Sequence, residues 1–374
     1  MPIYKTNKAK DGKQQYRVTW NYTDKNGKYK QISKLVYGMN EAKLAEIALK
    51  QKADEGGAPA GETVAEFYEK YITSISKEVR ETTVMKKRSN SQNHIIPFLG
   101  DIKMKNLSTS LMQEWKDYIN EKGLSLKMRQ NLYKEFNSML NFAVKTGHLS
   151  SNCLNVLGNF RDAYTLESSE EKIQYYSPDE IKKFLAVASA HNSSLSDYGY
   201  YVFFAIAVYT GMRKGEINAL RWCDIKGNTV SVTRSVNQKL KGKGYVFTPP
   251  KNASSVRKLQ IPSKLIEILN KQNQLQKKNS PRWNENFLVC GGITCLSDTN
   301  ISNRNIAYAN EADLRVLRVH DFRHTHATLL INEGINIQEI ARRLGHATPS
   351  VTWKVYAHLY PREEERALKV LENF

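Results

Sequence analysis

The sequence predicts a multidomain, mainly helical fold that opens with a small α+β domain, a three-stranded sheet plus one helix. Helical spacing of apolar residues recurs through most of the 374 residues, whereas strand-like alternation is confined to the first forty residues and to 230–261. This length allows two or three domains. Hydrophobic residues make up 40% of the chain, which is enough to build buried cores and argues against wholesale disorder.

The first block, residues 1–60, contains the clearest strand. Apolar and polar residues alternate over residues 15–22, which predicts a half-buried strand. The apolar face holds Tyr16, Val18, Trp20 and Tyr22, and the polar face holds Gln15, Arg17, Thr19 and Asn21. Asn26-Gly27 predicts a hairpin turn, followed by a second strand over about 28–37. A helix is expected over 40–52 from the spacing of Leu44, Ile47 and Leu49.

Basic residues are concentrated at the start of the chain, before a Gly- and Ala-rich linker at 53–61. Residues 1–34 carry nine Lys or Arg against two Asp. The sheet is therefore either a solvated basic surface or a face that enters a DNA groove, where polar side chains bond phosphates and base edges. We favour the DNA interpretation, and the candidate contacts are Arg17, Thr19, Asn21, Lys28 and Lys30.

The second block, residues 62–165, is predicted to be helical throughout. The expected helices cover about 63–78, 83–98, 108–122 and 125–146. Gly123 and Gly147 end the last two. Basic side chains line the solvent side of the fourth helix, but this pattern is common on any helix and does not by itself indicate DNA contact.

The third block, residues 175–374, begins with a helix-start signature. In Ser177-Pro-Asp-Glu180 the serine can cap, the proline fits the first position and the glutamate can bond back. Helices dominate from there to the end. The expected β segments are 230–236, 245–248 and 257–261.

The net charge of the chain is +19 at pH 7, from 56 Lys and Arg against 37 Asp and Glu. This excess suggests a polyanionic partner, nucleic acid first and an acidic membrane surface second. The longest apolar run, Tyr200–Tyr209, is far shorter than the roughly 20 residues of a spanning helix, so it predicts a buried core helix and no membrane segment is expected. The start has no apolar signal region and the four cysteines suggest reduced thiols, so a cytoplasmic location is expected.

Dispersed polar residues of the third block form the candidate site. Arg213 and Glu216 are three residues apart in a helical segment, and His320 and Arg323 repeat this spacing in another. Each residue alone has a structural explanation, such as a surface ion pair or a core tyrosine. The hypothesis of a site depends on their combination and order. The set is Arg213, Glu216, Lys251, His320, Arg323, His346 and Tyr356.

Residues 175–374 resemble the catalytic domain of tyrosine recombinases, the integrase family of phages and conjugative transposons. The likeness is carried by Thr-Gly-Met-Arg213-Lys-Gly-Glu-Ile, His320-Asp-Phe-Arg323-His-Thr-His-Ala-Thr, Leu-Gly-His346 and Val-Tyr356-Ala-His. Residues 62–165 are similar to the helical core-binding domain of this family, and residues 1–60 to its arm-type DNA-binding domain. The resemblance implies a site-specific recombinase that integrates or excises a prophage or mobile element in a bacterial host.

The resemblance also implies chemical roles. Arg213 and Arg323 would clamp the non-bridging oxygens of a DNA phosphodiester, and His346 would donate a further hydrogen bond. Tyr356 would attack phosphorus and form a 3′-phosphotyrosine link. A phenol with an ordinary pKa near ~10 is a poor nucleophile at neutral pH, so it needs nearby positive charge and a base, for which His320 is the family-matched candidate.

The remaining assignments have competitors. Lys251 would protonate the leaving 5′ oxygen, and it is preferred to Lys258 because it precedes the Ser-Ser-Val-Arg stretch as in the family pattern. Tyr360 competes with Tyr356 but lacks the Tyr-Ala-His context. Glu216 would orient His320. No metal, cofactor or ATP is expected, since the sequence contains neither a Walker loop nor a carboxylate cluster for Mg²⁺.

Residues 362–374 predict a short amphipathic helix. Its apolar edge holds Ala367, Leu368, Leu371 and Phe374. This tail would pack on its own domain or, as in the family, dock on a neighbouring protomer. We favour docking, which gives a homotetramer on double-stranded DNA with core-type and arm-type sites. An accessory DNA-bending or excision factor is a further partner that the family pattern allows.

Two other functions fit parts of the sequence. Residues 337–345 and the helix from Pro349 resemble a helix-turn-helix, which suits a DNA-binding regulator without chemistry. A regulator has no reason to keep the Arg, His and Tyr set together. A relaxing topoisomerase could use the same chemistry, but relaxation needs no second class of DNA site, which the basic first block suggests.

Overall fold

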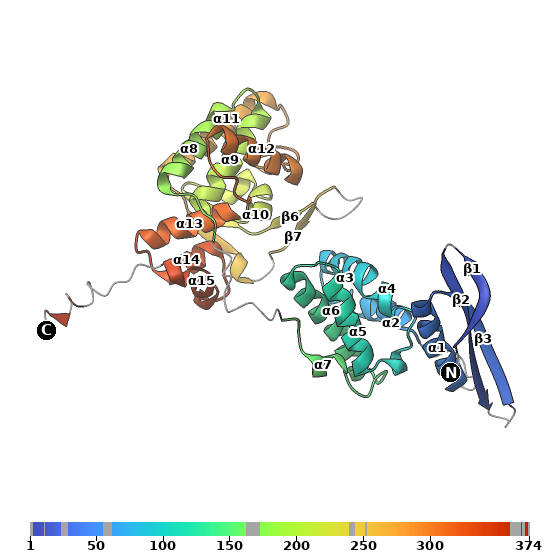
Figure 1. The fold of residues 1–374 in the computed structure, drawn as a ribbon. Coiled ribbons are helices and arrows are strands. Elements are labelled where there is room, and N and C mark those ends of the chain that lie inside the picture. Colours follow the sequence, from blue (N-terminus) through green and yellow to red (C-terminus); the bar gives the residue numbers. More distant parts are fainter. Residues whose placement is uncertain are drawn as a thin grey trace. The chain divides into compact units, whose positions relative to one another are not determined.

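The computed structural model describes residues 3–10, 12–23, 29–54, 62–161, 173–238, 244–250 and 253–359, and also residues 368, 371 and 372. The chain divides into two compact units, residues 1–166 and 167–374. Figure 1 shows that helices make up most of both units and that strands form small sheets. The predicted fold class, mainly helical with an N-terminal three-stranded sheet and helix, is confirmed.

The N-terminal sheet is antiparallel with the order β1-β2-β3, and one helix follows it. The elements are β1 (Ile3–Lys10), β2 (Lys13–Thr23), β3 (Tyr29–Tyr37) and α1 (Met39–Asp54). Val18 of β2 packs against Ala42, Ala45 and Leu49 of α1. Small alanines at the contact let the helix lie close to the sheet. Leu44 and Ile47, two of the residues from which the helix was predicted, are instead exposed.

The rest of the first unit is a helical bundle. Its elements are α2 (Val64–Ile75), α3 (Glu81–His94), α4 (Ile96–Leu99), η1 (Met104–Asn106), α5 (Thr109–Glu121), α6 (Leu126–Lys145) and α7 (Leu154–Leu157). Thr63 and Glu66 cap α2 reciprocally through side chain and backbone. Trp115 and Phe136 meet edge to face in the core, with ring centroids 5.0 Å apart. The helix predicted over 83–98 is interrupted at Ile95, and α4 begins at Ile96, the residue before Pro97.

The second unit is built around one buried helix, α9 (Leu195–Thr210). The same unit contains α8 (Pro178–Ala190), α10 (Lys214–Asn218), α11 (Ser263–Asn279), α12 (Asp298–Glu311), α13 (Asp321–Asn332), α14 (Ile337–Leu344) and α15 (Pro349–Tyr356). Helices α8, α10, α11 and α13 pack against α9, whereas α14 and α15 form a separate apolar cluster with α13. In the part of this unit that the structure describes, the short 3-10 turns are η2 (Trp222–Asp224), η3 (Ala253–Ser255) and η4 (Ala357–Leu359). The apolar run Tyr200–Tyr209 lies inside α9, so its prediction as a core helix is confirmed. None of the described helices is long and apolar enough to cross a membrane.

The described strands of the second unit form two small antiparallel sheets. One has the order β4 (Ile225–Lys226), β5 (Thr229–Val232) and β8 (Arg257–Gln260). The other is a hairpin of β6 (Ser235–Asn237) and β7 (Val246–Thr248). The single β segment expected over 230–236 is thus divided between the two sheets. The helix start expected at Ser177 is confirmed, with Ser177 and Glu180 forming a reciprocal cap on α8.

Candidate active site

The turn after α9 brings three distant segments together. The Thr210 hydroxyl donates to the carbonyl of Ile206 and accepts from the backbone N–H of Met212, which closes the end of the helix. Gly211 has a φ of +64°, a conformation that favours glycine. A Cβ there would lie 2.6 Å from Cδ2 of His326 and 2.9 Å from a methyl carbon of Leu344. The glycine therefore permits the close approach of α13 and α14 to this turn.

Arg213 follows this turn and is held by Glu216. Its Nη1 donates to Oε1 of Glu216 at 2.9 Å, and its backbone N–H donates to Oε2 at 3.0 Å. The Glu216 side chain is only 5% exposed, whereas that of Arg213 is 38% exposed. Glu216 therefore holds the Arg213 side chain in place, while the exposed part of that side chain remains open to a ligand. The prediction that Glu216 orients His320 remains a prediction, since the described hydrogen bonds of the Glu216 carboxylate are with Arg213 and Arg257.

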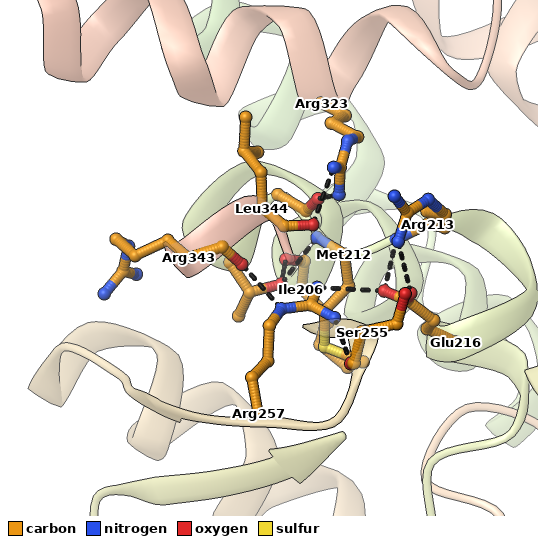
Figure 2. A network of polar contacts seen from close by, with 11 residues as sticks. Ile206, Met212, Arg213, Glu216, Ser255, Arg257, Arg323, Arg343 and Leu344 are labelled. Carbon is orange, nitrogen blue, oxygen red and sulfur yellow. Dashed lines mark hydrogen bonds and ion pairs between the residues drawn. The ribbon is translucent and has the colours of Figure 1, made fainter. Parts of the chain in front are cut away.

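Arg257, a residue that the sequence reasoning missed, completes this network (Figure 2). Its Nη2 donates to Oε2 of Glu216 at 2.9 Å, its Nε to the carbonyl of Arg343 at 2.6 Å, and its Nη1 to the carbonyl of Ser255. Burial alone would raise the pKa of Glu216, but the charges of Arg257 and Arg213 outweigh burial and lower it. Glu216 is therefore ionised at neutral pH. The only sequence signal for Arg257 was its place after the Ser-Ser-Val stretch.

Arg323 lies on the buried side of the same site. Its Nη1 donates to the carbonyl of Gly211 at 2.8 Å and its Nη2 to that of Leu344 at 2.6 Å. The side chain is 4% exposed, and burial together with the charge of Arg213 lowers its pKa to about 9. Arg323 therefore stays protonated at neutral pH, beside another arginine. A bound anion would stabilise this pair of neighbouring positive charges.

Two of the predicted histidines are uncharged here. His346 follows the left-handed Gly345 that ends α14, and its Nδ1 lies 2.7 Å from the Thr352 hydroxyl. Burial, then the charges of Arg323 and Arg213, lower the pKa of His346 to about 4. His320 precedes α13 and keeps an exposed face. Partial burial of its ring, followed by its neighbours His324 and Arg323, lowers its pKa to about 4 as well.

Tyr356 ends α15 and is 1% exposed. It packs in a cluster with Ala327, Ile331 and Leu344. Burial raises its pKa, and the charge of Arg323 opposes this shift in part. Its hydroxyl makes a 2.7 Å hydrogen bond with Nδ1 of His324. His324 directly follows Arg323 in the sequence motif, and no role was predicted for it.

The other predicted residues fall outside this cluster or outside the described residues. Lys251 and Tyr360 lie among residues that the structure does not describe, as does most of the tail 362–374. Lys258, the competitor of Lys251, is exposed on β8. Within the described parts of the chain, no three His, Cys, Asp or Glu side chains are grouped as metal ligands.

The N-terminal sheet carries the other candidate contacts on the face away from Val18 and α1. The register pairs Arg17 with Tyr4 and Leu35, Thr19 with Ser33, and Asn21 with Gln31. This face is hollowed around Arg17, Thr19 and Asn21. Lys30 pairs with Tyr22 and therefore lies on the opposite face, so the structure does not group it with the other three. Lys28 lies outside the described residues.

Comparison with protein families gives two matches. The model of the phage integrase family matches residues 174–363. The model of the phage integrase N-terminal SAM-like domain matches residues 63–120. The first match covers the whole cluster from Arg213 to Tyr356.

Curated proteins and solved structures are similar over most of the chain. The ICEBs1 integrase of Bacillus subtilis is 25% identical over 374 residues, with 98% of each chain covered. A tyrosine recombinase XerC-like protein of Caldanaerobacter subterraneus is 26% identical over 397 residues, with 99% of this chain and 98% of that protein covered. The Tn1549 transposon integrase in complex with transposon right end DNA aligns with a TM-score of 0.68 at 22% identity, covering 84% of this chain and 100% of that one. A lambda integrase tetramer bound to a Holliday junction aligns with a TM-score of 0.55 at 16% identity, covering 93% and 96%.

Proposed function

The chain belongs to the phage integrase family of tyrosine recombinases and is a site-specific DNA recombinase, and from this premise we propose that Tyr356 is the nucleophile. In this proposal the second unit cleaves and rejoins DNA strands through a 3′-phosphotyrosine link to integrate or excise a mobile element or prophage. The observation that carries it is the convergence of Arg213, Arg323 and His346 with Tyr356. The charge of Arg323 acts to lower the pKa of the Tyr356 hydroxyl and also that of the His346 ring.

The arginine pair supports phosphodiester chemistry. The transition state of phosphoryl transfer gathers negative charge on the non-bridging oxygens. Arg213 is partly open to solvent, and Arg323 uses two of its five N–H groups in its hydrogen bonds to the carbonyls of Gly211 and Leu344. His346 and His320, uncharged at neutral pH, can add hydrogen bonds to the same phosphate. Fixed donors of this kind stabilise the developing charge without reorganising at the moment of reaction.

Lys251 remains the proposed acid for the leaving 5′ oxygen. The tyrosine oxygen would bond to phosphorus as the bond from phosphorus to the 5′ oxygen breaks, and Lys251 would give that oxygen its proton. The described strands β7 and β8 flank the segment that contains this lysine. The phosphotyrosine conserves bond energy, so a 5′ hydroxyl of another strand can reverse the step.

Three regions are proposed to contact DNA. Residues 175–374 would form the catalytic domain, and residues 62–165 would bind the core-type site together with it. Residues 1–60 would bind an arm-type site through the face that carries Arg17, Thr19 and Asn21. Support comes from the exposure of Arg17 and Asn21 and from the polar character of their cross-strand partners Ser33 and Gln31.

A homotetramer formed through residues 362–374 is the proposed active assembly. A groove on the second unit is lined by apolar side chains that include Ile181, Leu185 and Leu329, and it is bordered by Lys182, Lys264 and Arg343. The tail offers matching chemistry, with glutamates at 363–365 followed by its apolar edge. This complementarity supports docking of the tail of a second copy in the groove.

A trapping assay tests the function. The full chain is mixed with a nicked DNA site taken from the joined ends of the element that carries the gene, and the products are run on a denaturing gel. A covalent adduct that is lost in Tyr356→Phe but kept in Tyr360→Phe supports the proposal. DNA binding with no adduct at any site tried would favour the alternative, a DNA-binding regulator without catalytic chemistry. Relaxation of plasmids without a specific site would favour the topoisomerase.

A further inference from the structure

The hydroxyl of Tyr356 is paired with a residue that the phosphate-binding set does not include. The 2.7 Å separation from Nδ1 of His324 is that of a good hydrogen bond, and the two ring centroids lie 5.6 Å apart. On its other side, His324 meets His320 edge to face at 5.4 Å between centroids. His324 thus stands between the exposed His320 and the buried tyrosine.

We propose that His324 takes the proton of the Tyr356 hydroxyl during strand cleavage, an inference that rests on the proposed role of Tyr356 as nucleophile. The base role predicted for His320 from the family resemblance then passes to His324, since His324 is the histidine bonded to the reacting oxygen. His320, nearer the surface, remains available to the DNA phosphate. The two histidines are four residues apart and share a face of the chain at the start of α13.

The surroundings of His324 favour the protonation state that this role needs. Nδ1 can accept from the tyrosine only when the ring is neutral and carries its proton on Nε2. Burial lowers the pKa of His324, the charge of Asp321 opposes the shift, and the charges of Arg323 and Arg318 add to it. Among the described residues, the rings of His320 and Tyr356 also contact its ring. The ring is therefore neutral at pH 7.

Groups already named account for every proton that moves in this step. The O–H bond of Tyr356 breaks and its proton moves to Nδ1 of His324 while the tyrosine oxygen forms its bond to phosphorus. The bond from phosphorus to the 5′ oxygen breaks, and that oxygen receives a proton from the acid, for which Lys251 is proposed. Rejoining runs both transfers backward. Because burial raises the pKa of Tyr356, a free phenolate is disfavoured, and transfer to a bonded base coupled to attack avoids it.

Two substitutions in the full chain separate proton transfer from simple positioning. His324→Ala removes the base, and His324→Asn keeps a polar side chain that can hydrogen bond but cannot take up the proton. The readout is the single-turnover rate of covalent adduct formation on the nicked site over a range of pH, with and without added imidazole. General-base catalysis contributes roughly 10²- to 10⁴-fold, so both variants are expected to be slower by about that factor.

Imidazole is expected to accelerate His324→Ala at least about tenfold. The wild-type rate is expected to fall as His324 becomes protonated at low pH, and this limb of the profile is expected to be missing from His324→Ala. An alanine variant that cleaves at the wild-type rate, or an asparagine variant that restores it, would overturn the proposal. Unfolding temperatures and binding to the intact site verify that the variants are folded.

Nitrogen NMR of the histidine rings tests the proposal without any substitution at His324. The wild-type spectrum should show an unprotonated Nδ1 at His324, and Tyr356→Phe should shift that signal. A protonated Nδ1 in the wild type would contradict the role. If Tyr356→Phe still formed the covalent adduct, the proposed nucleophile would be wrong, and that result is distinguishable from failure of His324 alone.

Discussion

At the scale of single residues, Arg257 stabilises the site without facing the substrate. It is 7% exposed and spans Glu216, Ser255 and Arg343, which belong to three separate segments. A lysine keeps the charge but lacks the planar fork that reaches three acceptors. We expect Arg257→Lys to lower the unfolding temperature and to slow cleavage by roughly tenfold or more, since a loosened Glu216 no longer holds Arg213.

Arg342 provides the matched control for that substitution. It is an exposed arginine on α14 that pairs with Glu339, and exposed pairs contribute only about 0–1 kcal/mol. Arg342→Lys should leave both the unfolding temperature and the cleavage rate close to wild type. Equal behaviour of the two variants would show that the Arg257 network does not position the site.

A buried histidine makes the stability of the second unit depend on pH. Nδ1 of His326 donates to the carbonyl of Val208, and burial lowers the pKa of His326 to about 3 from an ordinary value of 6.5. The unfolded chain therefore takes up a proton near pH 6.5, while the folded chain resists protonation down to about pH 3. Stability is fully present above 6.5 and is lost as the pH falls below it, by about 1.4 kcal/mol per pH unit for this residue.

Urea unfolding of the full chain at pH 7, 6 and 5 measures this effect. His320 and His346, with pKa values lowered to about 4, act in the same direction. The free energy of unfolding should fall over this range, and His326→Gln should have a shallower pH dependence. A flat profile in the wild type would show that these histidines are not held neutral.

At the scale of elements, the turn that joins α9 to α10 depends on Gly211. Alanine there would need a left-handed backbone and would collide with His326 and Leu344. Gly227 is the matched control, since its φ is +57° but nothing lies within 4 Å of a Cβ. We expect Gly211→Ala to cost about 1–3 kcal/mol more than Gly227→Ala in denaturant unfolding and to impair adduct formation. Equal losses of unfolding free energy in the two variants would mean that α13 and α14 do not pack closely against this turn.

The elements that the sequence predicted well are those whose signal is local. The strand over residues 15–22, the cap at Ser177 and the buried α9 follow from alternation, capping and a continuous apolar run. The division of the β segment after Val232 was not predictable, because it depends on which strands pair across the chain. The buried face of α1 was also missed, since alanines carry a weak hydrophobic signal.

Contacts between distant segments also account for what was missed in the site. Arg213, His320, Arg323, His346 and Tyr356 were predicted as candidates from their order and from the family resemblance. The bonds from Arg257 to Glu216 and from His324 to Tyr356 depend on how distant segments pack. No spacing in the sequence reports such contacts.

At the scale of the whole molecule, assembly should be separable from DNA binding. Removing residues 362–374 eliminates the proposed docking segment and leaves the described site in place. We expect the truncated chain to bind a single core-type site within a few-fold of wild type and to lose most recombination between two sites. Leu185→Glu, which places a charge in the groove, should behave likewise. Normal recombination by the truncated chain would contradict docking of the tail on a second copy.

The central claim, that Tyr356 carries the covalent link to DNA, is tested most directly by mass spectrometry of the trapped complex. The adduct formed on the nicked site is digested with protease and nuclease, and the peptide that retains a nucleotide is sequenced by fragmentation. We predict a single modified peptide with the nucleotide attached through its 3′ phosphate to Tyr356. A nucleotide on Tyr360 or on any other residue, or a link through a 5′ phosphate, would contradict the account.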